Sequence, residues 1–281
     1  MRILSLNAWG GRVFEPLLPF LTRIDADVLC LQEVVRTPGA GIRWLTYRGD
    51  GAELPQRANL HDEVRALTPD HESGFFPSAR GVLHAPSGVL HGPGGVFHDS
   101  DIAFPSEFGL ATYTRRSLPV IGQALGFIHG AFSAEGWGAH PRPRNAHGVR
   151  LYDDATGAPI CVVHLHGLRE LTGKIDTPHR RAQAHALVRL IERIWSPGER
   201  LVVCGDFNLL PDSETFAILG ALGLVDLVTT RGFTDTRTSF YRKDNRFADY
   251  LLATPNVDVS RFEVVASPEV SDHRPLLLDI G

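Results

Sequence analysis

Residues 201–208 read Leu-Val-Val-Cys-Gly-Asp-Phe-Asn, an apolar run that ends abruptly in a glycine, an aspartate and an asparagine. The run favours a buried strand, and Gly-Asp-x-Asn is favourable turn chemistry in its own right. A strand that stops at polar residues presents them in a loop on a rigid scaffold, which is where sites are usually assembled. Asp206 and Asn208 are therefore the first candidate site residues.

Similar apolar runs recur on both sides of this stretch, each bounded by Gly, Pro, Asp or Asn as strands are. They are MRILSLNAW, ADVLCLQEV, FGLATYTRR, AHGVRLYDD, APICVVHLH, FADYLLAT, RFEVVAS and HRPLLLDI. Helical spacing of apolar residues predicts helices over about 177–195, 15–24 and 213–222. Many strands with few helices indicate two packed sheets with helices on the outer faces.

Polar residues close several of these runs at the points where loops would begin. They are Asn7, Glu33, His164, Asp206, Asn208, Asp249 and His273. Because the loops of such an architecture gather at the ends of its sheets, we expect these side chains to converge at one end.

The composition indicates a single domain over residues 1–281. At 43% hydrophobic and 21% charged, the chain has enough apolar material for one large core. Its formal net charge of −4 gives no global positive field, so a polyanion would need local arginines and a bound cation. No basic-then-apolar leader or apolar run of about 20 residues is visible, so a cytoplasmic location and a monomer are the default expectations.

Residues 81–98 form a local repeat, GVLHAPS-GVLHGPG-GVFH, with a histidine every seven residues at 84, 91 and 98. Its Gly and Pro density predicts a surface insertion of short strands at about 70–105. The histidines, with Asp99 and Asp101, could form a second metal site. A solvated loop with incidental histidines is the favoured interpretation, because nothing fixes a ligand geometry.

The strand-end residues suit the hydrolysis of a phosphate ester. Anionic phosphate oxygens repel nucleophiles, so the reaction needs a cation, a positioned water and a proton source. Glu33 and Asn7 offer hard oxygen ligands, which suit Mg²⁺ or Mn²⁺ better than Zn²⁺. The sequence therefore predicts a metal-dependent phosphoesterase.

Six motifs, LNAWGG, LQEV, VVHLHG, GDFN, FADYLL and SDHRPLL, occur in this order along the chain. Their order resembles the endonuclease/exonuclease/phosphatase superfamily, which includes DNase-I-like nucleases and neutral sphingomyelinases. The resemblance spans the whole chain. It implies an α/β (α+β) fold, a four-layered α/β/β/α sandwich of two packed mixed sheets, with the active site at one end of the sheets.

The resemblance also implies a role for each motif residue. Glu33 would be the main ligand of the Mg²⁺ or Mn²⁺ cofactor, with Asn7 and Asp272 beside the same ion. Asp206 and Asn208 would position and polarise the attacking water.

Two pairs of residues complete the implied site. His273 would act in proton transfer or phosphate binding, held by Asp249. His164 would stabilise charge on the phosphoryl group. His166 shares its strand face and takes that role if the register is off by two; otherwise it contacts substrate at the pocket wall.

Substrate contacts are expected from cationic segments beside the strands. Arg144 and Asn145 are the preferred pair. Arg142, Arg169, Lys174, Arg180, Arg181 and Gln183 form the wider group of candidates.

Three functions remain open from the sequence. A nuclease-type phosphodiesterase leads, and nucleic acid stays a candidate substrate. A phosphatase or a phospholipid or sphingomyelin-type phosphodiesterase on the same fold is the alternative. A catalytically silent binding module is disfavoured, because such a module has no need of the full set of polar residues.

Overall fold

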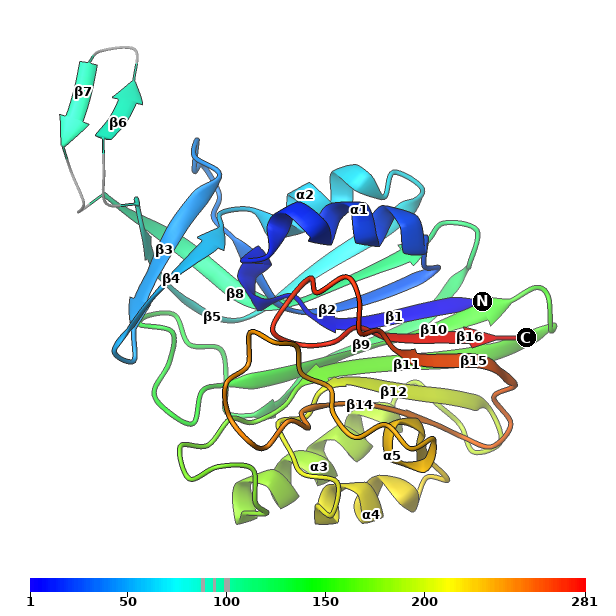
Figure 1. The fold of residues 1–281 in the computed structure, drawn as a ribbon. Helices are drawn as coiled ribbons and strands as arrows, with labels where there is room; N and C mark the ends of the chain where they lie inside the picture. The colour runs from blue at the N-terminus through cyan, green and yellow to red at the C-terminus, as the bar shows by residue number, and fades with distance from the viewer. Residues whose placement is uncertain (87–88, 93–94, 99–101) are drawn as a thin grey trace.

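The computed structural model describes residues 1–86, 89–92, 95–98 and 102–281. Two β-sheets pack face to face, with helices on the outer face of each (Figure 1). The predicted fold class, a four-layered α/β/β/α sandwich of two mixed sheets, is confirmed.

The larger sheet has eight strands. They are β1 Arg2–Asn7, β2 Val28–Arg36, β3 Trp44–Gly49, β4 Ala52–Arg57, β5 His71–His84, β8 Ala103–Arg115, β15 Val259–Val264 and β16 Leu276–Ile280. Their spatial order is β15-β16-β1-β2-β8-β5-β3-β4. β1 and β2 pair in parallel, and the other described pairs of this sheet are antiparallel.

The smaller sheet has six strands. They are β9 Val120–His129, β10 Arg144–Asp153, β11 Ala158–His166, β12 Arg200–Asp206, β13 Val225–Asp226 and β14 Asp249–Ala253. Their order is β13-β14-β12-β11-β10-β9, and β11 pairs with β12 in parallel. Each sheet thus has one parallel pair near its middle, and the strands of a parallel pair end at the same edge.

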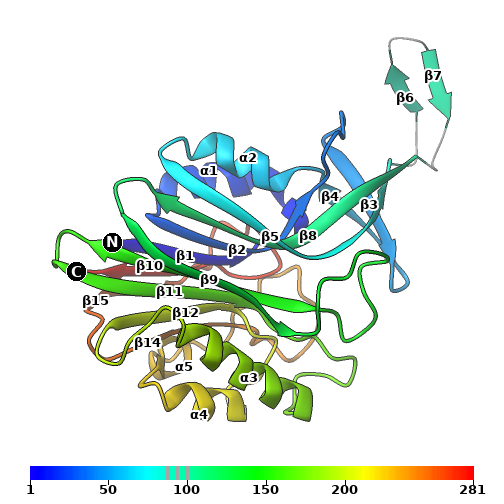
Figure 2. The same cartoon turned by 180° about the vertical axis from the view of Figure 1, so that it is seen from behind.

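The helices form the two outer layers. They are the short 3₁₀ turn η1 Trp9–Gly11 and the helices α1 Phe14–Ile24, α2 Leu60–Leu67, α3 Pro178–Ile191, α4 Glu214–Gly220 and α5 Leu227–Thr230. α1 and α2 cover the larger sheet, whereas α3, α4 and α5 cover the smaller one, as both opposite views show (Figures 1 and 2). Thr177 caps α3 by accepting a hydrogen bond from the Arg180 backbone, and Pro178 occupies its first turn.

The main core lies between the two sheets. Ile3 and Val28 of the larger sheet meet Val162 and Val203 of the smaller one in a single apolar cluster. Each of these side chains is almost fully buried, and such burial contributes about 1.5–3 kcal/mol per side chain. This rigid core fixes the strand ends that carry the candidate site.

The region expected as an insertion at about 70–105 is mostly sheet. β5 pairs with β8 from His71 to His84, so residues 71–84 belong to the larger sheet. Pro77 interrupts the strand pattern in the sequence. In the structure it lies at a register shift, where the backbone hydrogen bond that proline cannot donate is not needed.

The remainder of the repeat forms a separate hairpin. β6 Val89–Gly92 pairs with β7 Gly95–His98, away from the two large sheets (Figure 1). The side chains of His91 and His98, and the residues Asp99 and Asp101, lie outside what the structure describes, so the idea of a second metal site there stays an expectation. Among the described residues, no helix is long and apolar enough to span a membrane.

Candidate active site

Four polar side chains lie where the two parallel strand pairs end. Asn7 and Glu33 come from β1 and β2, while His166 and Asp206 end β11 and β12. The register sets His166 directly beside Asp206. Asn7 Nδ2 donates a hydrogen bond to Oδ2 of Asp206 at 3.0 Å, which joins the ends of the two sheets. Asn7, Glu33 and Asp206, which the sequence predicted to converge, therefore lie together at one end of the sandwich, with His166 beside them.

Glu33 lies in a local irregularity of β2. The register with β8 shifts between Leu31 and Val34, and Glu33 has a positive φ of 54°. A bulge of this kind re-aims a side chain, and a non-glycine residue in the left-handed region is strained. Glu33 keeps this strained conformation, and its carboxylate lines the pocket beside Asp206.

Three carboxylates crowd this part of the site. Burial, then the nearby charges of Asp272 and Asp206, raise the pKa of Glu33 to about 7, although a hydrogen bond with Asn7 and the charge of Arg144 oppose the shift. A hard divalent cation that binds between carboxylate oxygens reduces the repulsion between them. Glu33, Asp272 and the amide oxygen of Asn7 therefore fit such a cation.

Asp206 occupies the centre of the cluster. Its Oδ1 accepts from the backbone N–H of Asn208 at 2.9 Å, and its Oδ2 accepts from Asn7. Oδ2 also lies 3.7 Å from Nε2 of His166 and 3.7 Å from Nε2 of His273. Asn208 has a positive φ of 55° and bonds through Nδ2 to the Gly167 carbonyl at 3.4 Å, so both motif residues are held rigidly.

Asp249 and His273 form the expected carboxylate–imidazole pair. The two carboxylate oxygens of Asp249 lie 2.9 and 2.8 Å from Nδ1 of His273. Burial, followed by the charge of Arg237, lowers the pKa of His273 to about 4, while burial raises that of Asp249. The interior thus works against a charged imidazolium.

Arg237 was not among the predicted site residues. Its Nη1 donates to Oδ2 of Asp272 at 2.8 Å and also contacts Nε2 of His273. It lies in the segment 231–246, between the motifs GDFN and FADYLL. Its backbone bridges to that of His273, a long-range contact that local pattern does not reveal.

Arg144 reaches the pocket, whereas Asn145 does not. Arg144 is 6% exposed and lines the pocket near Glu33 and Asp206, and within the described part of the chain its buried Nε has no hydrogen-bond partner. Burial lowers its pKa to about 10, which still leaves it cationic at neutral pH. Asn145 instead donates from Nδ2 to the Phe76 carbonyl at 3.0 Å, and this hydrogen bond ties β10 to β5. Adjacent strand residues point to opposite faces, so Asn145 points away from the pocket that Arg144 lines.

His164 and His166 are separated in depth. His164 is buried between the sheets, with Nε2 bonded to Thr112 at 2.8 Å and Nδ1 to Gln32 at 3.3 Å. It does not line the pocket, whereas His166 lies at its wall, 3.7 Å from an oxygen of Glu33. Of the two histidines, His166 rather than His164 thus lines the pocket.

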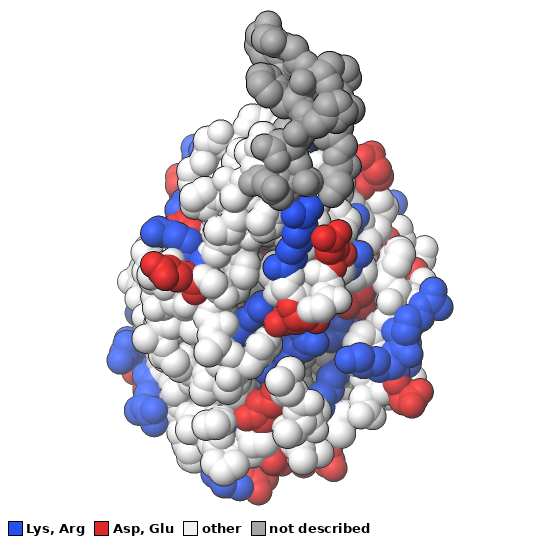
Figure 3. Space-filling model, turned by 90° about the vertical axis from the view of Figure 1, so that its left-hand side faces the viewer, with Lys and Arg blue, Asp and Glu red and all other residues white. Residues whose placement is uncertain are grey.

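The residues of this cluster open into a cavity of about 740 Å³. Its walls come from the β3–β4 hairpin and from the loops 137–143, 169–174 and 237–245. Both lysines of the chain, Lys174 and Lys243, line it. On this face of the molecule, basic and acidic side chains are interleaved around the middle (Figure 3).

The wider group of candidate residues falls into two sets: residues that line the pocket wall and residues that hold the surrounding loops in place. Arg180 is buried and donates to the carbonyls of Leu168, Gly173 and Asn208, so it braces the loops behind the pocket. Lys174 donates to the carbonyls of Asn245 and Phe247 and so ties two pocket loops together. Gln183 accepts from the Leu168 backbone, Arg181 pairs with Glu214, and Arg142 pairs with Asp50. Arg169 is exposed at the pocket wall.

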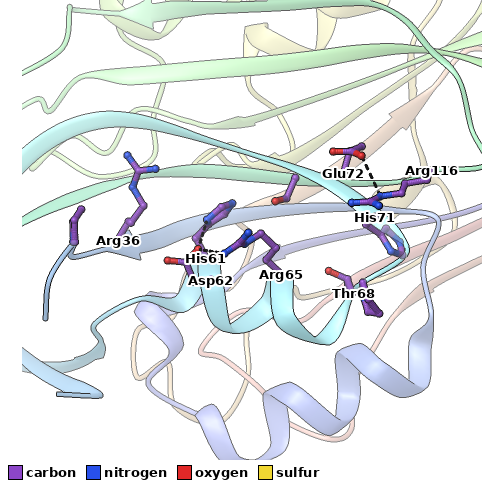
Figure 4. Close-up of a pocket in the computed structure, with 11 residues that line it drawn as sticks. Arg36, His61, Asp62, Arg65, Thr68, His71, Glu72 and Arg116 are labelled. Atoms are coloured by element: carbon purple, nitrogen blue, oxygen red, sulfur yellow. Dashed lines mark ion pairs between the residues drawn. The ribbon is translucent and has the colours of Figure 1, made fainter. Parts of the chain in front are cut away.

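A second cavity of about 700 Å³ lies beside α2, away from these residues (Figure 4). Its three arginines are all paired with acids: Arg36 with Glu107, Arg65 with Asp62 and Arg116 with Glu72. None of the predicted site residues lines it.

A four-layered sandwich whose strand ends gather carboxylates, histidines and an arginine into one pocket defines a class of metal-assisted phosphoester hydrolases. The chain belongs to the Endonuclease/Exonuclease/phosphatase family, whose sequence model matches residues 4–273. Members of this family are hydrolases that act on phosphoester bonds and typically use a divalent metal. The resemblance found in the sequence is thereby confirmed.

Solved structures show the same fold at low sequence identity. A family protein from Bacteroides vulgatus has a TM-score of 0.65 at 17% identity, covering 100% of this chain and 98% of its own. A mannosyl-6-phosphatase from Bacteroides thetaiotaomicron gives 0.65 at 13%, with 100% and 99% covered. The catalytic domain of human Nocturnin with a bound sulfate anion gives 0.61 at 18%, with 100% and 93% covered. No curated protein matched the sequence.

Proposed function

We propose that the protein is a Mg²⁺- or Mn²⁺-dependent phosphoesterase that cleaves phosphodiester bonds, as nucleases do. One observation carries the proposal. The carboxylates of Glu33 and Asp206 and the ring of His166 meet beside a buried arginine, Arg144, whose Nε has no hydrogen-bond partner among the described residues. A buried cation next to metal-binding carboxylates suits a phosphate group, since phosphate satisfies both.

The metal would be held by Glu33, with Asp272 and Asn7 beside it. When bound, the ion would polarise the phosphoryl group and offset the charge that develops in the transition state. The oxygen-rich ligand set favours Mg²⁺ or Mn²⁺.

Asp206 and Asn208 would orient the attacking water. The Asn208 backbone and the Asn7 amide fix the Asp206 carboxylate, so its remaining lone pairs point in defined directions. Nε2 of His273 lies 3.7 Å from Oδ2 of Asp206, close enough for one water to contact both. Asp249, bound at Nδ1, keeps Nε2 without a proton, and this lone pair accepts from Arg237 in the structure, so proton transfer at Nε2 would require the Arg237 contact to open.

Arg144 and His166 would bind the phosphoryl oxygens. We assign to His166 the charge-stabilising role that motif order gave to His164, because His166 is at the pocket wall. Asn145 is left as a strand-bridging residue.

A small phosphate monoester is the second candidate substrate. Asp50 lines the pocket, and it pairs with Arg142 at 3.0 Å and with His140 at 3.3 Å. Acidic side chains in the wall interrupt any continuous basic path along which a long polyanion could lie. This observation favours a compact substrate.

The test is turnover of a panel of esters by the full chain. Bis-p-nitrophenyl phosphate, p-nitrophenyl phosphate, plasmid DNA, RNA and sphingomyelin vesicles are each offered with Mg²⁺, Mn²⁺, Ca²⁺ or EDTA. The proposal expects diester turnover with Mg²⁺ or Mn²⁺ that EDTA abolishes, and a preference for p-nitrophenyl phosphate would favour the monoester candidate. Turnover of none of the esters contradicts the proposal and favours the silent binding module. Turnover unaffected by EDTA contradicts the proposed metal dependence.

A further inference from the structure

A guanidinium group lies inside the cluster of candidate catalytic residues. The Arg237 side chain is 6% exposed, and its Nη1 contacts Oδ2 of Asp272 and Nε2 of His273. The group is held from two further sides. Its backbone bridges to His273, and the ring of Tyr241 lies 4.3 Å from the guanidinium carbon. The position of this cation is thus built into the loop.

The same neighbourhood contains a second set of atoms that could bind a metal. Ligand atoms of Asp206, Asp249 and His273 all lie within 4.8 Å of one another, and all three residues are buried. Together with the cluster at Glu33, they would make room for a pair of divalent ions, as in two-metal phosphoesterases.

The ligand atoms of this second set are already bonded within the protein. Both oxygens of Asp249 face Nδ1 of His273, and Nε2 of His273 accepts from Arg237. The oxygens of Asp206 accept from Asn208 and Asn7. A divalent ion here would have to break these bonds and to approach the positive charge of Arg237 in a buried site, where repulsion is poorly screened.

We propose that Arg237 supplies the second positive charge of the active site, so that each chain binds one divalent ion, at Glu33, rather than two. The inference rests on the proposed metal-dependent function and adds the number of divalent ions bound per chain. Arg237 also lines the pocket, so its remaining N–H groups can reach a phosphoryl oxygen where a second metal would otherwise stand.

Mn²⁺ binding by the full chain tests the proposal, with free Mn²⁺ followed by electron paramagnetic resonance and heat by calorimetry. The wild type should bind one Mn²⁺. Arg237→Met, which frees Nε2 of His273 and Oδ2 of Asp272, should bind two, with the second ion bound roughly 100-fold more tightly than any second ion of the wild type. Adding His273→Gln to Arg237→Met should abolish the second ion.

Arg242→Met is the matched control, because Arg242 is exposed in the same loop and does not line the pocket; it should bind one ion. Arg237→Lys, which keeps the charge, should also bind one. Thermal melting checks that each variant folds. If Arg237→Met does not fold, spin coupling between two Mn²⁺ ions in the saturated wild type decides the question.

Two outcomes overturn the inference: two Mn²⁺ ions of comparable affinity in the wild type, or a folded Arg237→Met that still binds one. Neither touches the proposed function, which requires only that an ion bind at Glu33. A wild type that binds no divalent ion overturns the proposed function itself, and the inference with it.

Discussion

His164 and His166 are two residues apart on β11 and share a strand face, yet only His166 lines the pocket. We expect His166→Ala to lower kcat/KM by roughly 10²–10³-fold with an unchanged melting temperature, because charge stabilisation at the phosphoryl group is lost. His164→Ala should keep turnover within a few-fold but lose about 1–3 kcal/mol of unfolding free energy, since Thr112 loses one of its two buried histidine partners and Gln32 loses its contact with the ring. Steady-state kinetics and thermal melting of both variants would reveal the reverse pattern if His164 were the active residue.

Asp249 and His273 are expected to act as a unit, because Nδ1 of the ring has both carboxylate oxygens as its partner. Asp249→Asn, His273→Ala and the double variant should each lose roughly 10²-fold or more in kcat/KM and end at similar residual rates. The measurement is a double-mutant cycle on a p-nitrophenyl ester. Effects that multiply independently would show that the two residues work apart.

At the scale of elements, β10 and β11 carry two histidines into the space between the sheets. His147 and His164 are both bonded to the hydroxyl of Thr112. Burial lowers the pKa of His147 to about 4 and that of His164 well below its usual value. Both rings are therefore neutral in the folded protein, while the unfolded chain binds a proton on each below about pH 6.5.

Stability should consequently fall as the pH drops below about 6.5. The unfolded state then holds more protons than the folded state, so the free energy of unfolding decreases by up to about 1.4 kcal/mol per pH unit for each histidine, until the pH reaches the folded pKa. For His147, the loss between pH 6.5 and 4 is about 3 kcal/mol. Urea unfolding of the wild type, His147→Gln and the exposed control His185→Gln should show a shallower pH dependence in His147→Gln alone. Equal slopes in all three would refute the assignment.

The β6–β7 hairpin is attached at a point where β5 and β8 are already paired. His84 is the register partner of Ala103, and the Ala85 backbone donates to the Ile102 carbonyl at 2.9 Å. Replacing residues 87–101 by a short glycine turn should therefore preserve the fold, the melting transition and the turnover of small esters. Loss of cooperative melting in the deletion variant would mean that the hairpin contributes to the core.

The elements that the sequence predicted are those with an uninterrupted apolar pattern. The strand after Arg200 and the helix after Thr177 were found because burial on one or both faces leaves a periodic signal. β9 lacks a clear alternation because several of its exposed residues, such as Leu125 and Phe127, are apolar, and Pro77 interrupts the pattern of β5. Candidate site residues such as Glu33 were predicted because a carboxylate after an apolar run is unusual.

Residues that join the site through tertiary contacts could not be found in this way. Arg237 reaches His273 across 36 residues of sequence, and no local pattern separates it from the other arginines. The pocket position of His166 could not be predicted from the sequence, because alternation fixes the face of a strand and not the depth at which it ends.

At the scale of the whole molecule, the charge distribution and the fold point to the same place. A chain of net charge −4 concentrates arginines and both lysines in one pocket, around three crowded carboxylates. The hydrogen bond between Asn7 and Asp206 joins the two sheets there. We therefore propose that a bound cation makes this crowding favourable, with Glu33 as its main ligand.

Titration calorimetry of Mg²⁺ and Mn²⁺ into the wild type and Glu33→Gln tests this claim most directly, with Glu135→Gln, an exposed loop variant, as the control. We expect Glu33→Gln to fold and to bind either ion at least about tenfold more weakly, because a neutral amide is a poorer ligand than a carboxylate. Diester turnover should be lost in parallel. Glu135→Gln should match the wild type. Unchanged Mg²⁺ and Mn²⁺ affinity in a folded Glu33→Gln would contradict the account.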